Sequence, residues 1–388
     1  MKFVWIIIVS LLFFSCSRKK VQYTIENQDN FIFVNIADDF NHERNLKISD
    51  IASDIEYIQL ETSDKSIMSN IVKVVVTSEH IFCSDSQKNL MMFLRNGSFL
   101  HKIANRGQGP NDYYDLLDFT VDTVYQKIYI ADYAQRIREY NFEGKFSKDI
   151  KLNMQMSRIE LLETGKLVCY IPEELYAADS IKYNICIIDT NGVVINKHIA
   201  RLQRNGNNLI GSHFAIFYQR PEGSLAFIEA LNDSLYSFTN QNDYIAYGCL
   251  NKGIHKINPE LTFEQVAFES SHNMRINKFI ETPFGMFIRY ACNCRGINKS
   301  HWSYFDKSEH RFFQLPEEKA INNDLDGGFN IFPICWTNNY LIGYIESMDF
   351  LHDVDFSKVT KERQISLKQF TEKLKNDDNP LLVLIKTK

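Results

Sequence analysis

Two cysteines separated by one residue, Cys292 and Cys294, lie between two arginines, Arg289 and Arg295. Residues two apart on a strand share a face, so these thiols could form a disulfide or contribute to a metal site. A metal site needs further ligands, and none of the ten histidines forms a cluster with the pair. We therefore expect structural thiols or one disulfide, and no metal. The arginines could bind carboxylates or sugar acids through paired hydrogen bonds, or form a solvated strand face.

A glycine-rich segment, Arg106–Pro110, is a second candidate for a binding site. It lacks the spacing and the Lys-Ser/Thr pair of a phosphate-binding loop, and no helical pattern follows it. Its glycines and proline are typical of a connection between strands. The alternative is that Arg106, Asp112 and Tyr113 line the mouth of a ligand-binding site, because loops on a rigid scaffold often carry function.

Asp85 and Asp132 could serve as a catalytic carboxylate pair, but they occupy equivalent positions of an internal repeat. The segment that ends at Asp85 recurs 47 residues later, and the glycine turn at Gly97 recurs at Gly144 with the same offset. Repetition favours a structural role, in which each carboxylate caps backbone N–H groups of the adjoining loop and each glycine forms a hairpin turn.

An apolar run of twelve residues, Phe3–Phe14, follows Lys2 and ends at Ser15-Cys16. A membrane span needs about 20 apolar residues, so this run is typical of a signal peptide. A small residue before a cysteine is the layout of a lipoprotein signal. We therefore predict that residues 1–15 are removed and that the Cys16 thiol is acylated. An ordinary signal peptide that happens to contain a cysteine is the alternative.

Residues 16–50 are polar and irregular, and we predict that they form the membrane anchor and a tether. The basic Ser17–Lys20 segment would lie beside anionic lipid headgroups. Residues 51–388 consist of short apolar strands separated by turn residues, which predicts a single all-β domain. One helix is expected at Lys361–Lys375, just before the last strand, because its apolar residues recur with helical spacing.

Units of about 40 to 50 residues with three or four strands each are typical of β-propeller blades. Six blades fit the recognisable units best, and seven are the alternative. Glu56–Leu60 is expected to pair with strands from the C-terminal end. This pairing would close the ring and remove exposed sheet edges.

Several motifs resemble those of the six-bladed β-propeller lipoproteins of Gram-negative bacteria, which are distantly similar to propellers with NHL-type repeats. The resemblance covers nearly all of the mature chain; its motifs are specific for the fold and carry little information on function. NHL-type propellers are mostly binding platforms, with a few enzymes among them. Residues 155–320 depart most from the pattern and would set any particular specificity. The matching segments are Tyr57–Thr62, the strand ends at Asp85 and Asp132, Arg106–Pro110 with Tyr113, Asp326–Gly328 and Asp378–Leu381.

The chain contains no Gly-x-Ser-x-Gly or His-Glu-x-x-His motif, and its net charge of −5 argues against nucleic-acid binding. We therefore expect a cofactor-free, non-enzymatic module that binds a peptide, a glycan or an envelope protein. It would be anchored through Cys16 on the periplasmic side of the outer membrane. The alternatives are a lyase or hydrolase with its site in the central channel of the propeller, or a structural scaffold with a large exposed apolar patch.

Overall fold

The structure is a computed structural model. It describes residues 31–388 except for 153, 173–182, 200–214, 230–231, 257–272, 293–298, 317–320, 355 and 359–360. No helix in these described ranges is long and apolar enough to cross a membrane. The expected signal peptide, Cys16 and the segment Ser17–Lys20 lie outside the described residues.

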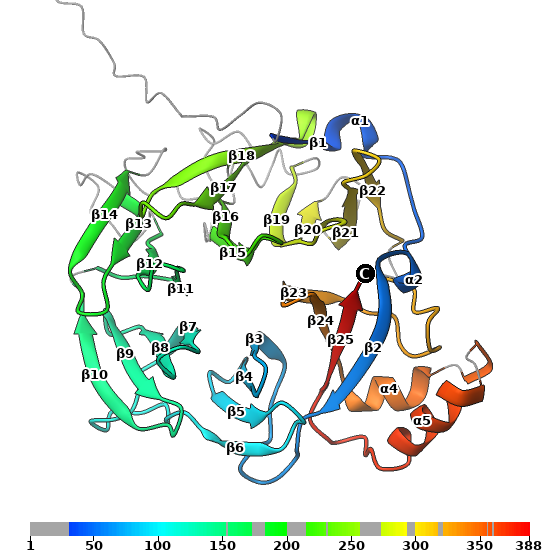
Figure 1. Cartoon of the computed structure of the whole chain (residues 1–388), viewed down its shortest axis with the longest axis horizontal. Coiled ribbons are helices and arrows are strands. Elements are labelled where there is room, and N and C mark those ends of the chain that lie inside the picture. Colours follow the sequence, from blue (N-terminus) through cyan, green and yellow to red (C-terminus); the bar gives the residue numbers. More distant parts are fainter. Residues whose placement is uncertain are drawn as a thin grey trace, which may run out of the picture.

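Six antiparallel sheets stand around a common axis and form a closed ring (Figure 1). The predicted six-bladed β-propeller is confirmed, and each sheet is one blade. Blades 1 to 3 follow the chain in order from the inside of the ring to its rim. They consist of β3 (Ile71–Val76), β4 (His80–Asp85), β5 (Leu90–Leu94) and β6 (Phe99–Lys102); β7 (Leu116–Asp122), β8 (Lys127–Asp132), β9 (Arg136–Asn141) and β10 (Phe146–Lys151); and β11 (Arg158–Leu161), β12 (Leu167–Tyr170), β13 (Tyr183–Ile188) and β14 (Val194–Ile199).

Blades 4 and 5 have the same arrangement, whereas blade 6 combines strands from both ends of the chain. Blade 4 consists of β15 (Ala215–Gln219), β16 (Leu225–Glu229), β17 (Ser234–Phe238) and β18 (Tyr244–Asn251); blade 5 of β19 (Arg275–Glu281), β20 (Gly285–Cys292), β21 (Lys299–Asp306) and β22 (Arg311–Gln314); and blade 6 of β23 (Pro333–Thr337), β24 (Tyr340–Ile345), β25 (Leu381–Thr387) and β2 (Ala52–Gln59).

The ring is closed by the pairing of β2 with the last strand, β25. The two strands run antiparallel along most of their length, with Glu56 opposite Leu384. This is the closure expected for Glu56–Leu60. It joins the two ends of the domain by backbone hydrogen bonds, so that blade 6 cannot separate from the ring without breaking them.

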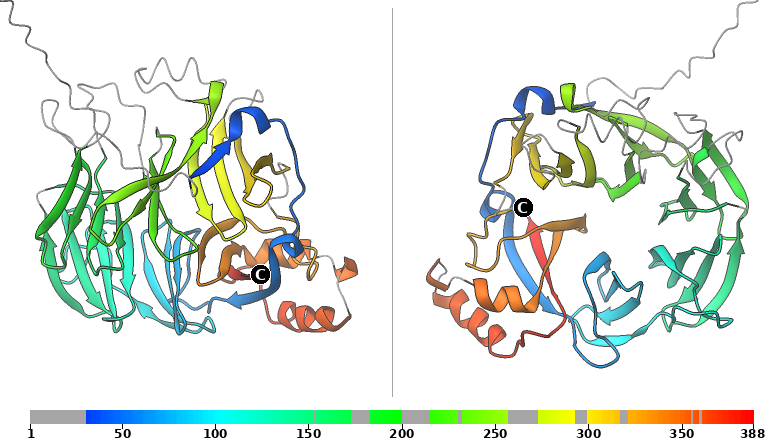
Figure 2. Two further views of the ribbon diagram at one scale, coloured as in Figure 1. Left: turned by 45° about the horizontal axis from the view of Figure 1, so that its top comes forward. Right: turned by 180° about the vertical axis from the view of Figure 1, so that it is seen from behind.

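A strap formed by residues 32–51 differs from the polar tether expected for residues 16–50. Its first element, β1 (Ile32–Asn35), adds a fifth strand to blade 4 by pairing in parallel with β18. The short helices α1 (Ile36–Asp39) and α2 (Ile48–Ile51) then carry the chain past blade 5 to β2 (Figure 2). Six apolar side chains bury the strap against the blades; they are Val34, Ile36, Phe40, Leu46, Ile48 and Ile51.

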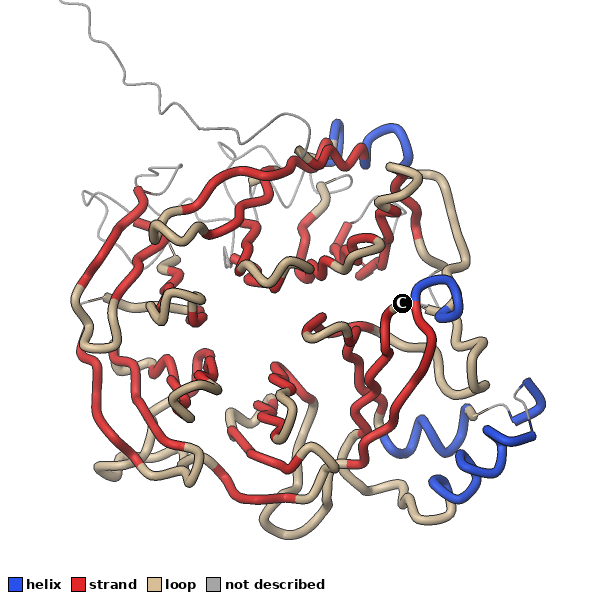
Figure 3. Tube along the Cα trace, viewed as in Figure 1, coloured by secondary structure: helices blue, strands red, loops and turns tan. Residues whose placement is uncertain are grey.

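The remaining helices lie on the outer side of the ring (Figure 3). The predicted C-terminal helix is present as α5 (Lys361–Thr371), which ends four residues earlier than expected, and a second helix, α4 (Ser347–Asp353), precedes it. Two short 3-10 helices complete the elements, η3 (Gly253–His255) and η4 (Phe356–Lys358).

The core is divided among the interfaces between neighbouring blades. One buried cluster joins Phe82 and Met92 of blade 1 to Phe119 and Ile128 of blade 2. A single blade would leave both of its faces exposed, so packing around the ring supplies the stability that no blade has alone. The inner strands of the six blades are thereby held in fixed positions around the axis.

Candidate functional site: the central channel

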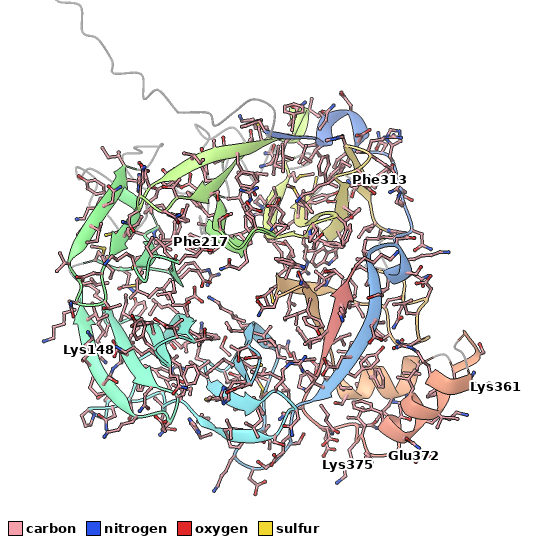
Figure 4. The ribbon with its side chains drawn as sticks, in the orientation of Figure 1. Lys148, Phe217, Phe313, Lys361, Glu372 and Lys375 are labelled. Atoms are coloured by element: carbon pink, nitrogen blue, oxygen red, sulfur yellow. The ribbon has the colours of Figure 1, made fainter. Side chains whose placement is uncertain are left out.

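A cavity of about 1040 Å³ occupies the axis of the ring. It is lined by residues from the innermost strand of every blade, namely β3, β7, β11, β15, β19 and β23. Phe217 of β15, for example, lies on the inner side of blade 4 (Figure 4). We call this cavity the channel.

Each inner strand contributes several residues to the channel wall, and one of them lies near the middle of the strand. In four of these strands the pairing register shifts just before that residue. Such bulges re-aim side chains and are frequent beside functional sites. We call the resulting set the channel ring, which consists, from blade 1 to blade 6, of Lys73, Asp118, Glu160, Phe217, Lys278 and Cys335.

The first three members of the channel ring form an ion-pair cluster that links blades 1, 2 and 3. Lys73 Nζ lies 3.0 Å from Asp118 Oδ1 and 2.5 Å from Glu160 Oε1. Burial by itself would lower the pKa of Lys73, but the two carboxylates raise it above its ordinary value. Asp118 also accepts a hydrogen bond from the backbone N–H of Ile159, at 3.0 Å. This lysine is therefore fully charged and already neutralised by the protein.

Lys278 is the second lysine of the channel ring, and its surroundings are different. It is half-buried and, among the described residues, has no ion pair or hydrogen bond of its side chain. Burial lowers the pKa of Lys278, and the nearby Arg289 guanidinium lowers it further, against the opposing influence of Cys335. Burial also raises the pKa of the Cys335 thiol to about 11, so at neutral pH this thiol is uncharged and does not neutralise the lysine.

The wall of the channel carries a surplus of positive charge. Six cationic side chains line it against three carboxylates, although the whole chain has a net charge of −5. Apolar side chains such as Val74, Leu116 and Phe217 line the remainder. The cationic residues are Lys73, Lys88, Arg158, Arg220, Arg275 and Lys278, and the acidic ones are Asp85, Asp118 and Glu160.

The loop expected to line a ligand-binding mouth connects β6 to β7 and does not line the channel in the described structure. Tyr113 is fully buried and donates its hydroxyl to the carbonyl of Lys88 at 2.7 Å, so its side chain is not accessible to a ligand. Asp112 accepts the N–H of Gly109 at 3.1 Å. Arg106 is 57% exposed and pairs with Asp115, with Nε 3.2 Å from Oδ1.

Asp85 and Asp132 are both buried and occupy equivalent positions in blades 1 and 2. Asp85 accepts the backbone N–H of Asn89 at 2.9 Å, and Asp132 accepts those of Tyr114 and Asp115 at 3.0 Å. Each carboxylate thus accepts hydrogen bonds from backbone N–H groups of a loop that adjoins its own blade. The turn glycines Gly97 and Gly144 have φ angles of +90° and +72°, which only glycine adopts without strain.

Arg289 is half-buried on β20, directly behind Lys278. Its predicted companion Arg295 lies outside the described residues, as does Cys294. Cys292 is disulfide-bonded. The other described cysteines, Cys83, Cys169, Cys186, Cys249 and Cys335, are free. Within the described part of the chain, no three His, Cys, Asp or Glu side chains are grouped so that they could hold a metal ion.

Sequence reasoning singled out Arg289 but missed the charged members of the channel ring. The clearest case is Lys73, which stands alone inside the apolar inner strand Ile71–Val76, where it is surrounded by isoleucine and valine. An isolated charge in an apolar strand is costly unless it has a partner. That signal was available, but the sequence did not show which isolated charges converge.

The fold and the channel define this protein as a six-bladed β-propeller with a cationic central channel. Over residues 31–386 the chain matches the family described as a domain of unknown function (DUF4934), and it belongs to this family. The sequence matches none of the curated proteins with which it was compared.

Solved structures share the fold at low sequence identity. A Bacteroides fragilis protein described as exported is 18% identical, with a TM-score of 0.67, over 92% of this chain and 99% of that one. A virginiamycin B lyase from Staphylococcus aureus is 10% identical, with a TM-score of 0.41, over 86% of this chain and 99% of that one. The similarity to the B. fragilis protein shows a common fold.

Proposed function

We propose that this protein is an exported, lipid-anchored and non-enzymatic binding module whose channel takes an anionic ligand. The observation that carries the proposal is the cationic surplus of the channel wall in a chain that is acidic as a whole. A concave site walled by one sign of charge attracts ligands of the opposite sign and raises their local concentration.

The dimensions and lining of the channel support a peptide or a glycan that bears carboxylates. Its volume of about 1040 Å³ is at the upper end of the range of roughly 300–1,000 Å³ that is usual for small-ligand sites. Apolar side chains among the cations, such as Phe217, would contact the uncharged parts of the ligand. No specific observation in the described residues favours the lyase or hydrolase alternative, and we do not propose it.

A thermal-shift screen with matched ligands tests this function. Peptides with acidic side chains are compared with the same peptides carrying amides, and uronic acids with the corresponding neutral sugars. We expect only the carboxylate-bearing members to raise the melting temperature, by an amount that falls as salt is added, because ions screen the attraction. Equal stabilisation by the charged and neutral members would refute an anion-binding channel.

Two observations support export. The apolar leader with Cys16 is typical of a lipoprotein signal, and the B. fragilis protein with the same fold is described as exported. Replacement of the thiol (Cys16→Ala) should abolish palmitate labelling and release the protein from membranes. A variant with unchanged membrane retention would contradict the lipid anchor while leaving the binding proposal open to its own test.

A further inference from the structure

We infer that Lys278 and Trp336 in the channel wall, together with Arg289 behind Lys278, form an anion cradle between blades 5 and 6, and that this cradle binds an organic carboxylate. The inference rests on the proposed function and deepens it, because it names the groups that hold the charge of the ligand and the class of that charge.

The three side chains present hydrogen-bond donors that lack acceptors within the described structure. Lys278 has no carboxylate partner. The Nε of Arg289 and the Nε1 of Trp336 are buried and make no hydrogen bond. Buried polar groups are almost always hydrogen-bonded, and an unpaired donor is costly. Three such donors in one region therefore point to a missing acceptor.

The strand register places these donors on the two sides of one interface. Lys278, Arg289 and Trp302 are direct cross-strand neighbours on β19, β20 and β21, so they share one face of blade 5. Trp302 and Trp336 belong to the same buried cluster, which identifies that face as the one packed against blade 6. Lys278 and Trp336 also both line the channel, on the adjacent inner strands β19 and β23.

Lys73, the other lysine of the channel ring, differs from Lys278 because carboxylates of the protein neutralise its charge. Two carboxylates from the next blades lie within 3.0 Å of its Nζ. Lys278 occupies the corresponding place in blade 5, where the nearby groups are a second cation, Arg289, and the Cys335 thiol. Two cations and an indole N–H favour an anion as the occupant.

The chemistry of the cradle favours a carboxylate with an apolar body. A carboxylate accepts hydrogen bonds at both oxygens, which suits donors that approach from two blades. The indole ring of Trp336 and the side chains of Ile334 and Phe217 line the same cavity. They offer an apolar surface to the part of the ligand that adjoins its charge.

Intrinsic fluorescence can test the cradle because the chain has only three tryptophans, Trp5, Trp302 and Trp336. In the full chain carrying Trp5→Phe, the signal comes from Trp336 of the cradle and from Trp302, the cross-strand neighbour of Arg289. We expect sodium benzoate to change this fluorescence saturably, and the isosteric neutral benzamide to have no effect. Inorganic phosphate is titrated in parallel and should bind more weakly than benzoate.

Variants test the residues of the cradle individually. Lys278→Met and Arg289→Met should each raise the Kd for benzoate about tenfold or more. Lys151→Met is the matched control, because it removes the charge of an exposed lysine on the rim strand β10, outside the channel, and it should change the Kd less than about twofold. Circular dichroism verifies folding, and Lys278→Gln provides a second variant in case the methionine form does not fold.

The outcomes separate the cradle from the proposed function. Benzoate binding that is unaffected by the substitutions at Lys278 and Arg289 would overturn the cradle and leave anion binding elsewhere in the channel intact. Phosphate binding tighter than benzoate would overturn the assignment of a carboxylate. If neither probe gives a saturable response, the cradle is rejected, whereas the function itself is judged by the peptide and glycan screen.

Discussion

Replacing Lys278 with methionine should stabilise the ligand-free protein while it removes ligand binding. The Lys278 ammonium group is half-buried without a carboxylate partner, and Arg289 lies beside it. Methionine keeps the apolar stem and removes the desolvated charge. Burying a charge costs several kcal/mol, and the partial exposure of Lys278 reduces that cost, so we expect a gain of about 1 to 2 kcal/mol. In a chain of this size, this corresponds to a rise of about 2 °C in Tm.

The pH dependence provides an independent check of the same reasoning. Burial lowers the pKa of Lys278 in the folded state, so the unfolded chain keeps this proton to a higher pH than the folded protein does. Unfolding therefore takes up a proton between the two pKa values, and the wild-type stability rises with pH in that window. Near neutral pH, the free energy of unfolding of the wild type should fall below that of Lys278→Met by the full amount. This difference should shrink as the pH rises towards about 10.4, the usual value for lysine.

Urea unfolding of both proteins near pH 7 and near pH 10 measures these differences. The Cys335 thiol, whose pKa burial raises to about 11, is present in both proteins, so its own pH dependence largely cancels from the difference between them. A variant less stable than the wild type near neutral pH would refute the reasoning, since it would show that the lysine has a stabilising partner. If the difference in unfolding free energy between the two proteins does not change with pH, the charge of Lys278 is not its cause.

Three further predictions concern the scaffold. Gly97→Ala should cost about 3 kcal/mol, because its φ is +90° and its Cβ would lie 2.0 Å from a backbone oxygen. Gly165→Ala, with a φ of +71° and open space around it, should cost only about 1 kcal/mol; equal losses in urea unfolding would contradict this. Arg138→Met should cost about 2 kcal/mol, since it removes the buried guanidinium that pairs with Asp149 and donates to the Pro110 carbonyl, while Arg136 still pairs with Asp149. An unchanged unfolding midpoint would be the contrary result. Burial lowers the folded-state pKa of His101 and His198, so the stability of the protein should fall as the pH drops below about 6.5. A variant with both histidines replaced by glutamine should lose less stability over the same pH range. Measuring the Tm of both proteins against pH checks these expectations.

The fold was predictable because its signals are local. The 47-residue offset that relates Asp85 to Asp132 also relates Gly97 to Gly144, and each pair occupies the same place in its blade. Glu56–Leu60 was expected to pair with strands from the C-terminal end, because a propeller needs such a pairing to close the ring. The strap at residues 32–51 was missed because its few apolar residues are interspersed with polar ones and lie outside the repeat.

By itself, the sequence determined the fold class and the repeat of the blades, since strand periodicity, turn glycines and repeat length all depend on neighbouring residues. It did not determine the site. Lys278 and Trp336 lie far apart in the chain, and the Lys73 cluster draws on three blades. Only the closed ring decides which inner strands are adjacent, and the bulges within them decide which side chains reach the channel. Whether a lysine is neutralised by the protein or left for a ligand is therefore a property of the tertiary structure.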